Sequence, residues 1–267
     1  MQGYASLRSP TRPIPMDSTS TLPRPDAAAG ARTLAGQAQE LLRNDILSGR
    51  LAPGQRLRTK DLQARYGLGL SPLRESLQRL SAEGMVVNDE QRGFAVAPVS
   101  VEELQDLTQA RIALESIMLP QAMAQGGADW EAEIVAAFHR LSRTPLPQGV
   151  EAQADASLWE LRHRAFHLAL VQGCGSPWLL RIHGQLVDQS ERYRRIRLLR
   201  HQDHSAQVRD VNAEHQALMQ AVLDRDLERA RGLMAAHLEA TCRATIGLMR
   251  AADATASHAS TPDGAPT

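Results

Sequence analysis

The sequence predicts a mainly α-helical protein in two parts, a small helical unit that ends in a β-hairpin and a longer antiparallel bundle of helices. Two observations support this fold class. Residues 59–98 read as a short helix, a tight turn, a longer helix and a two-stranded ribbon. After residue 100, strand signals are nearly absent and helical patterns alternate with short breaks. A chain of 267 residues is long enough for two such domains.

The first unit begins with a predicted amphipathic helix over 34–48, whose apolar face includes Leu42 and Ile46. A short helix follows, which we expect Thr59 to cap through its hydroxyl. Gly67 is expected to end this helix, because glycine adopts the left-handed conformation at little cost.

The longer helix is expected to be capped by Ser71 and to end at Gly84. Arg74 falls on the face opposite its apolar stripe, where a helix that reads DNA needs polar side chains. The stripe consists of Leu73, Leu77 and Leu80. The apolar runs 85–87 and 94–96 flank a polar tip and predict a hairpin. This is the layout of a winged helix-turn-helix, although any small helical domain with a hairpin is an alternative.

The rest of the chain predicts about six helices with short connections, the pattern of an antiparallel bundle. The expected helices are 101–125, 128–142, 150–172, 177–200, 206–224 and 226–250. We therefore expect a winged helix-turn-helix, DNA-binding domain over 33–100 and an all-helical domain over 101–250. Residues 1–32 and 251–267 are rich in small and polar residues without periodicity, so both are expected to be disordered tails.

The small number of cysteines and the short apolar runs favour a reduced cytoplasmic compartment. The two cysteines offer no disulfide framework, and no apolar run approaches the length of a membrane span or a signal peptide, so a cytoplasmic location is expected. The net charge is zero, but residues 1–100 carry 13 Lys and Arg against 9 Asp and Glu. That asymmetry favours an N-terminal nucleic-acid partner only weakly.

Residues 34–100 resemble the DNA-binding domain of the GntR family of bacterial regulators. The similar stretches are ILSGRLAPGQRL (46–57), LRESLQRLSAEGMV (73–86) and RGFAV (92–96). The following residues resemble the helical FCD domain of the FadR subfamily, in the stretches ARIALES (110–116), RHRAFHLALVQGCGS (162–176), EHQALMQAVLDRD (214–226) and ARGLMAAHL (230–238). Within the FadR subfamily, the sequence is most similar to a branch of regulators that repress glutarate catabolism. The resemblance implies a homodimeric regulator of operator DNA that responds to a small carboxylate.

The resemblance places DNA contacts on Lys60, Ser71, Arg74, Arg92 and Gly93. Physical chemistry supports these positions, because an arginine fork recognises guanine and a helix N-terminus attracts phosphate. Family members usually carry an arginine directly before the position of Ser71, where this chain has Leu70. For Arg79, a surface ion pair is as plausible as a DNA contact.

Four histidines have an arrangement that suggests a ligand site. His163 and His167 share one helix face, and His215 and His237 lie among apolar residues on the last two helices. Neutral imidazole is the commonest metal ligand, so these residues predict a divalent-metal site. Many relatives have an aspartate at the position of His163, so a four-His site favours Zn or Ni over harder ions. Glu160 is a candidate partner for this site, and a metal-free cavity remains an alternative.

Effector binding is expected at Arg111, which matches the arginine of the family pattern R-x-x-L-E, and at Tyr193. An arginine can hold a carboxylate with two hydrogen bonds, but an internal ion pair between Arg111 and Glu115 is an equal alternative. The rest of the charged run SERYRRIRLLR (190–200) is expected to be a solvated face.

Three functions are compatible with these patterns. A ligand-responsive DNA-binding regulator, most simply a repressor, explains the most features. A metalloenzyme with an appended DNA-binding domain is an alternative, but no positioned nucleophile or acid–base pair is recognisable in the sequence. A DNA-binding protein without a ligand is the third.

Overall fold

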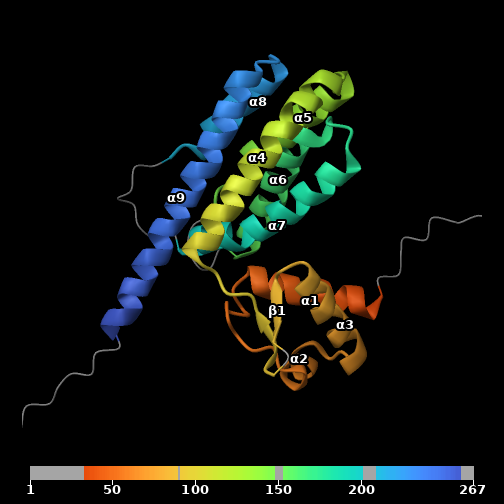
Figure 1. The fold of residues 1–267 in the computed structure, drawn as a ribbon, viewed down its shortest axis with the longest axis vertical. Coiled ribbons are helices and arrows are strands. Elements are labelled where there is room, and N and C mark those ends of the chain that lie inside the picture. The colour runs from red at the N-terminus through yellow and green to blue at the C-terminus, as the bar shows by residue number, and fades with distance from the viewer. Residues whose placement is uncertain (1–32, 90, 148–152, 201–208, 260–267) are drawn as a thin grey trace, which may run out of the picture. The chain divides into compact units, whose positions relative to one another are not determined.

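The computed structural model describes residues 33–89, 91–147, 153–200 and 209–259, and it confirms the mainly helical fold class (Figure 1). The first unit contains α1 (Leu34–Leu47), α2 (Thr59–Tyr66), α3 (Leu70–Ala82), β1 (Val86–Asp89) and β2 (Gly93–Val96). The two strands pair antiparallel and form the expected hairpin, in which Val86 faces Val96 and Asp89 faces Gly93. The apolar stripe of α3 packs against α1, and its leucines are fully buried.

Two predicted helix caps are wrong. Arg58 is the residue before α2 and Gly69 the residue before α3, and neither end has a side-chain cap. Both helices therefore begin before the expected hydroxyl, which places Thr59 first in α2 and Ser71 second in α3. The predicted end of α2 is confirmed, because Gly67 has a φ of 66° and its N–H bonds to the carbonyl of Gln63.

A buried carboxylate that sequence reasoning missed ties α2 to α1. Asp45 of α1 accepts hydrogen bonds from Tyr66 Oη at 2.8 Å and from Arg65 Nη1 at 3.2 Å. Arg50 pairs with the same carboxylate. Burial, together with Asp45, raises the pKa of Tyr66 to about 12. These contacts hold α2, the short helix that contains Lys60, against α1.

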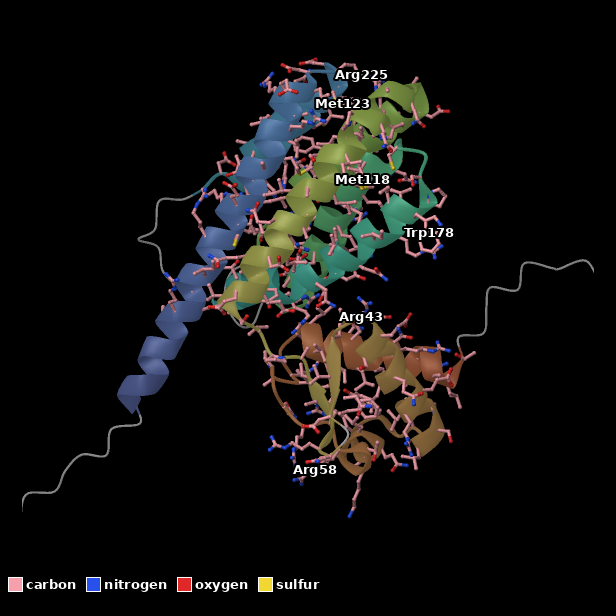
Figure 2. All side chains as sticks on the ribbon, viewed as in Figure 1. Arg43, Arg58, Met118, Met123, Trp178 and Arg225 are labelled. Carbon is pink, nitrogen blue, oxygen red and sulfur yellow. The ribbon has the colours of Figure 1, made fainter. Side chains whose placement is uncertain are left out.

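Within the described residues, the second unit is a bundle of six helices, and most of their bounds follow the predicted ones. The predicted helix starts over 150–152 and 206–208 lie outside the described residues. The helices are α4 (Val101–Gln125), α5 (Ala128–Ser142), α6 (Gln153–Gln172), α7 (Pro177–Arg200), α8 (Val211–Leu223) and α9 (Leu227–Ala259). Its core lies mainly between α4, α5, α6, α8 and α9. Met118 and Met123 are buried in this core, whereas Trp178 projects from the surface (Figure 2).

The last helix is longer than the sequence predicted. α9 continues to Ala259, so the expectation of a disordered tail from residue 251 differs from the structure. The segment 251–259 is rich in alanine, the best helix former, and it lacks proline and glycine. The remaining predicted tails, 1–32 and 260–267, lie outside the described residues. Among those that are described, no helix combines the length and apolarity needed to cross a membrane.

The predicted solvated face of α7 is also wrong where its side chains are described. Residues 190–195 are all buried. Arg192 donates to the carbonyls of Ala97 and Pro98 at 2.8 and 2.9 Å, and Arg194 pairs with Glu160 of α6 at 2.8 Å. The charges are buried because each finds a partner inside the protein, which periodicity along one helix does not reveal.

Candidate DNA-binding surface and buried histidine site

The five residues expected to contact DNA are all exposed on the first unit. Lys60 lies in the first turn of α2, and Ser71 and Arg74 lie in the first turns of α3. Arg92 and Gly93 lie at the tip of the hairpin, where Gly93 has a φ of 74°. Two helices and the hairpin thus expose positively charged side chains. These are the elements that a winged helix-turn-helix presents to DNA.

Two neighbouring residues refine this surface. Arg79 pairs with Glu75 one turn earlier on α3 at 2.5 Å, as the surface-ion-pair interpretation expects. Leu70, which occupies the position of the usual family arginine, is exposed at the start of α3. The leucine side chain donates no hydrogen bond, so Leu70 cannot replace the contacts that an arginine would make to a base or phosphate.

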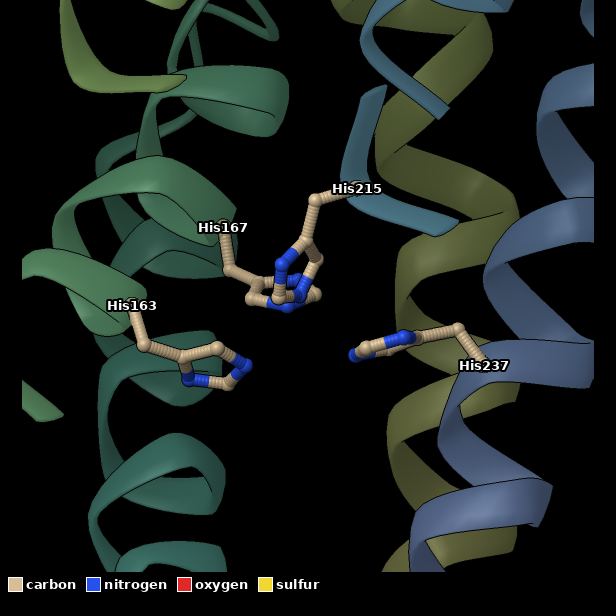
Figure 3. A group of neighbouring side chains, drawn as sticks. All are labelled: His163, His167, His215 and His237. Carbon is tan, nitrogen blue, oxygen red and sulfur yellow. The ribbon is translucent and has the colours of Figure 1, made fainter. Parts of the chain in front are cut away.

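The four histidines expected to form a ligand site come together inside the bundle (Figure 3). His163 and His167 extend from α6, His215 from α8 and His237 from α9. Each is between 1 and 5 per cent exposed. One ring nitrogen from each residue lies within 4.8 Å of those of the other three. Three helices thus direct four neutral donor groups into one buried volume.

The electrostatics of this cluster favour neutral rings with available lone pairs. Burial, and then the neighbouring histidines, lower the pKa values of His163 and His167 well below the ordinary value. Within the described part of the chain, neither nitrogen of His167 has a hydrogen-bond partner, and Nδ1 of His163 also lacks one. Buried polar atoms usually have partners, so these nitrogens fit a bound cation. The four imidazoles could therefore hold a metal ion.

Glu214 is a site residue that sequence reasoning missed. Its Oε2 lies 2.9 Å from Nδ1 of His237, and Arg209 pairs with it at 2.5 Å. Burial would raise the pKa of Glu214, but the hydrogen bonds from His237 and Arg209 lower it to about 2. The only signal in the sequence was an acidic residue directly before His215. The expected partner, Glu160, is instead paired with Arg194.

A buried ion pair on α4 acts electrostatically on the histidine cluster. Arg111 pairs with Glu115 at 2.8 Å within α4, and Nε2 of His183 lies 3.2 Å from the same carboxylate. Burial would raise the pKa of Glu115, but Arg111 and His183 lower it to about 2. Arg111 therefore has the internal partner that the sequence left as an alternative.

A small pocket with an enclosed volume of about 20 Å³ is lined by one arginine from each of two buried ion pairs, Arg111–Glu115 and Arg194–Glu160. Arg111 and Arg194 both line it, and both act electrostatically on His167. The pocket also exposes a set of hydroxyl-bearing residues: Thr108, Ser190, Tyr193, Thr241 and Thr245. Tyr193 also donates to Glu103 and accepts from the N–H of Ser100 at 3.4 Å. Each of these hydroxyls already donates to a backbone carbonyl or to Glu103, and both arginines are paired with carboxylates. A small oxyanion would therefore bind the arginines only by competing with their internal partners.

Comparisons with known proteins identify both units. Residues 34–96 match the family described as bacterial regulatory proteins, gntR family, and residues 106–240 match the FCD domain. The chain is 43% identical over 197 residues to the HTH-type transcriptional repressor GlaR of Escherichia coli strain K12, which covers 74% of this chain and 89% of that protein. The chain belongs to the GntR family. It is a member with an FCD domain, and proteins of this family are transcriptional regulators rather than enzymes.

Other GntR relatives agree with this assignment. The chain is 38% identical over 228 residues to the uncharacterized HTH-type transcriptional regulator BphR of Paraburkholderia xenovorans strain LB400, across 85% of this chain and 91% of that protein. The solved structure of E. coli McbR/YncC has a TM-score of 0.63 and 22% identity, and the match covers 80% of this chain and 98% of that one. The structural similarity supports the same fold.

Breaking the buried pair of α4 is expected to destabilise this GntR regulator. Glu115→Gln leaves the guanidinium of Arg111 buried without its countercharge, which costs about 3–5 kcal/mol. Glu133→Gln is the control, because its pair with Arg140 is exposed and contributes under about 1 kcal/mol. Urea unfolding at pH 7 measures both. An equal, small effect of the two substitutions would contradict the importance of burial.

The same variant has a predicted pH dependence. The pKa of Glu115 falls from an ordinary 4.5 to about 2 in the folded protein, so its stabilisation is complete above pH 4.5. The stabilisation from the Glu115 carboxylate is lost as the pH falls towards 2. The gap in unfolding free energy between wild type and Glu115→Gln should therefore narrow between pH 5 and pH 3, as unfolding curves at each pH would show.

Proposed function

We propose that this protein is a homodimeric repressor that leaves its operator when a small dicarboxylate enters the helical domain. The observation that carries the proposal is a pocket lined by two buried arginines, Arg111 and Arg194, beside four buried histidines. Identity to a relative named as a transcriptional repressor supports repression. The resemblance to regulators of glutarate catabolism makes glutarate the first candidate effector. The protein would act in the cytoplasm, where its operator lies.

The pocket chemistry supports an anionic effector of modest size. A guanidinium binds a carboxylate through two parallel hydrogen bonds, and two such groups suit a molecule with two carboxylates. The enclosed part of the pocket has room only for molecules of the size of water, so a larger effector requires side chains to move. The groups most directly affected are the internal partners, because an effector carboxylate competes with Glu115 for Arg111 and with Glu160 for Arg194.

A divalent ion held by His163, His167, His215 and His237 would complete this anion site. When bound, it would supply a positive charge that attracts a carboxylate. The four histidines themselves add no negative charge to oppose an anionic ligand.

α7 offers a route from the pocket to the DNA-binding unit. Its residues Ser190, Tyr193 and Arg194 line the pocket. Between them, Arg192 holds the carbonyls of Ala97 and Pro98, which precede α4. A shift of α7 on effector binding would therefore alter the connection between the two units. The effector must bind the two arrangements with different affinities, because only that difference moves their balance.

A homodimer follows from the requirements of DNA recognition. One short helix reads few base pairs, and two copies on adjacent half-sites give the selectivity that an operator needs.

Arg74→Ala is expected to weaken binding to the cognate operator by about 1–3 kcal/mol, as for the loss of a bidentate base contact. Binding to random DNA should weaken much less. Arg79→Ala is the matched control on the same helix, because Arg79 is already paired with Glu75. Fluorescence anisotropy with both DNAs measures the difference. Equal losses on cognate and random DNA would make Arg74 a phosphate contact.

The purified protein is expected to carry about one divalent ion per chain, as a closed site with four protein ligands does. His167→Ala and His215→Ala should remove it, whereas His139→Ala, on the exposed face of α5, should not. Elemental analysis after gel filtration is the measurement. Unchanged metal content in the first two variants would refute the site.

Glutarate is expected to weaken operator binding by wild type, and Arg111→Ala should remove this response while leaving DNA binding intact. Because alanine leaves Glu115 unpaired, the double variant Arg111→Met/Glu115→Gln tests the same role without a buried lone charge. Arg140→Met, on an exposed pair, is the control. Operator affinity is measured across a series of effector concentrations. A full response in the double variant would limit Arg111 to a structural role, and no response of wild type to any short dicarboxylate would refute effector sensing.

A further inference from the structure

We propose that Glu214 is the positioning carboxylate of the histidine site. It holds the Nδ1–H of His237 and so turns the opposite nitrogen, Nε2, toward the other three histidines. The inference rests on the proposed function, because it treats the four histidines as ligands of one divalent ion. It assigns a role to a residue outside the group of four.

The geometry joins two helices at the edge of the site. Oε2 of Glu214, in the first turn of α8, lies 2.9 Å from Nδ1 of His237 on α9. The ring of His237 points toward the other histidines (Figure 3). An imidazole whose Nδ1 is engaged by a carboxylate has only Nε2 left for an ion. The contact with Glu214 therefore selects which nitrogen of His237 faces the site.

The tautomer follows from the groups around Nδ1. A carboxylate only accepts hydrogen bonds, so an unprotonated Nδ1 would be repelled at 2.9 Å from Glu214. Nη2 of Arg209 lies 3.2 Å from the same nitrogen, a contact that would favour the opposite tautomer. However, that Nη2 already donates to Glu214 at 2.5 Å and to the carbonyl of His237 at 2.9 Å. The proton therefore belongs on Nδ1, and Nε2 keeps its lone pair.

Arg209 in turn fixes the carboxylate. Its Nε and Nη2 bond to the two oxygens of Glu214, each at 2.5 Å. Its Nη1 donates to Oγ1 of Thr241 at 2.9 Å, and Thr241 also lines the effector pocket. A bidentate pair restricts the rotamer of Glu214 more than a single contact would. The guanidinium of Arg209 thus connects Glu214, which orients His237, to Thr241 in the wall of the pocket.

The neighbouring acidic residues do not offer this support. Glu160 is bound by Arg194, and Glu115 by Arg111 and His183. Oε2 of Glu214, by contrast, bonds to Nδ1 of His237, a member of the four-His cluster. Carboxylates that orient metal-binding histidines this way commonly raise metal affinity 10–100-fold.

The first test measures zinc affinity of the full-length protein by competition with a chromophoric chelator. Glu214→Ala is expected to bind zinc about 10–100-fold more weakly than wild type. Glu214→Gln keeps an acceptor without the charge and should recover part of the loss. Glu239→Ala is the control, because Glu239 is an exposed carboxylate of α9 that pairs with Arg243. Wild-type affinity in Glu214→Ala would overturn the proposal.

The second test reads the tautomer directly in the metal-free protein. Nitrogen-15 NMR of the histidine rings, with the His237 signals assigned from a His237→Gln variant, should show Nδ1–H in wild type. Glu214→Ala should shift the ring toward the Nε2–H form, and a purely structural effect would not produce that change. An Nε2–H ring in wild type would overturn the assignment. If Glu214→Ala does not fold, the zinc affinity and the His237 tautomer are both measured in Glu214→Gln instead.

The two tests separate this inference from the proposed function. If wild type binds no zinc, the metal site of the proposed function is refuted and the positioning role falls with it. If wild type binds zinc and Glu214→Ala binds it equally well, only the role of Glu214 is refuted. Loss of affinity together with the changed tautomer supports both.

Discussion

The helical domain depends on the pairing of charges that lie between its helices. Water is largely excluded there, so an unpaired charge would be strongly destabilising. Arg194 of α7 meets Glu160 of α6, and Arg111 meets Glu115 within α4. His183 of α7 joins the second pair. These contacts restrict how α4, α6 and α7 pack, because a shift of one helix would separate buried charges that are paired at 2.8–3.2 Å.

The same exclusion of water shapes the histidine site. Burial keeps the rings of His163 and His167 neutral, and a neutral imidazole has the lone pair that a metal ion requires. Two arginines, each paired with a buried carboxylate, line a nearby pocket that is edged with hydroxyl groups. A core that only needed stability would contain apolar side chains at these positions. The polar groups at these positions support the ligand recognition that we propose.

The DNA-binding unit works under the opposite condition. Lys60, Arg74 and Arg92 are exposed, so their charges remain solvated and available to phosphates and bases. Attraction of this kind weakens with salt, as counterions compete for the DNA. The apolar stripe of α3 and the buried Asp45 contacts hold the reading elements in place without using the exposed face. Stability and recognition are thus assigned to opposite faces of the same short helices.

Most elements and the membership of the histidine site were predictable from the sequence. Periodicity located the helices of the bundle, glycine located the end of α2, and the spacing of His163 and His167 placed them on one face. Family resemblance added His215 and His237, which lie far from them in the chain. Helix starts were less predictable, because a hydroxyl at Thr59 or Ser71 is compatible with a cap and with the first helical positions.

The sequence by itself determined the local structure, since helical periodicity, helix-ending glycines and hairpin patterns depend on neighbouring residues. Only the tertiary structure decided which charges are buried and what they bind. Apart from Tyr193, the run 190–195 reads as solvated, yet Arg194 pairs with Glu160, which is 34 positions away. Glu214 likewise meets His237 across 23 positions. Such partners are set by how the helices pack, because the free energy of a buried charge depends on groups that adjoin it in space and not along the chain.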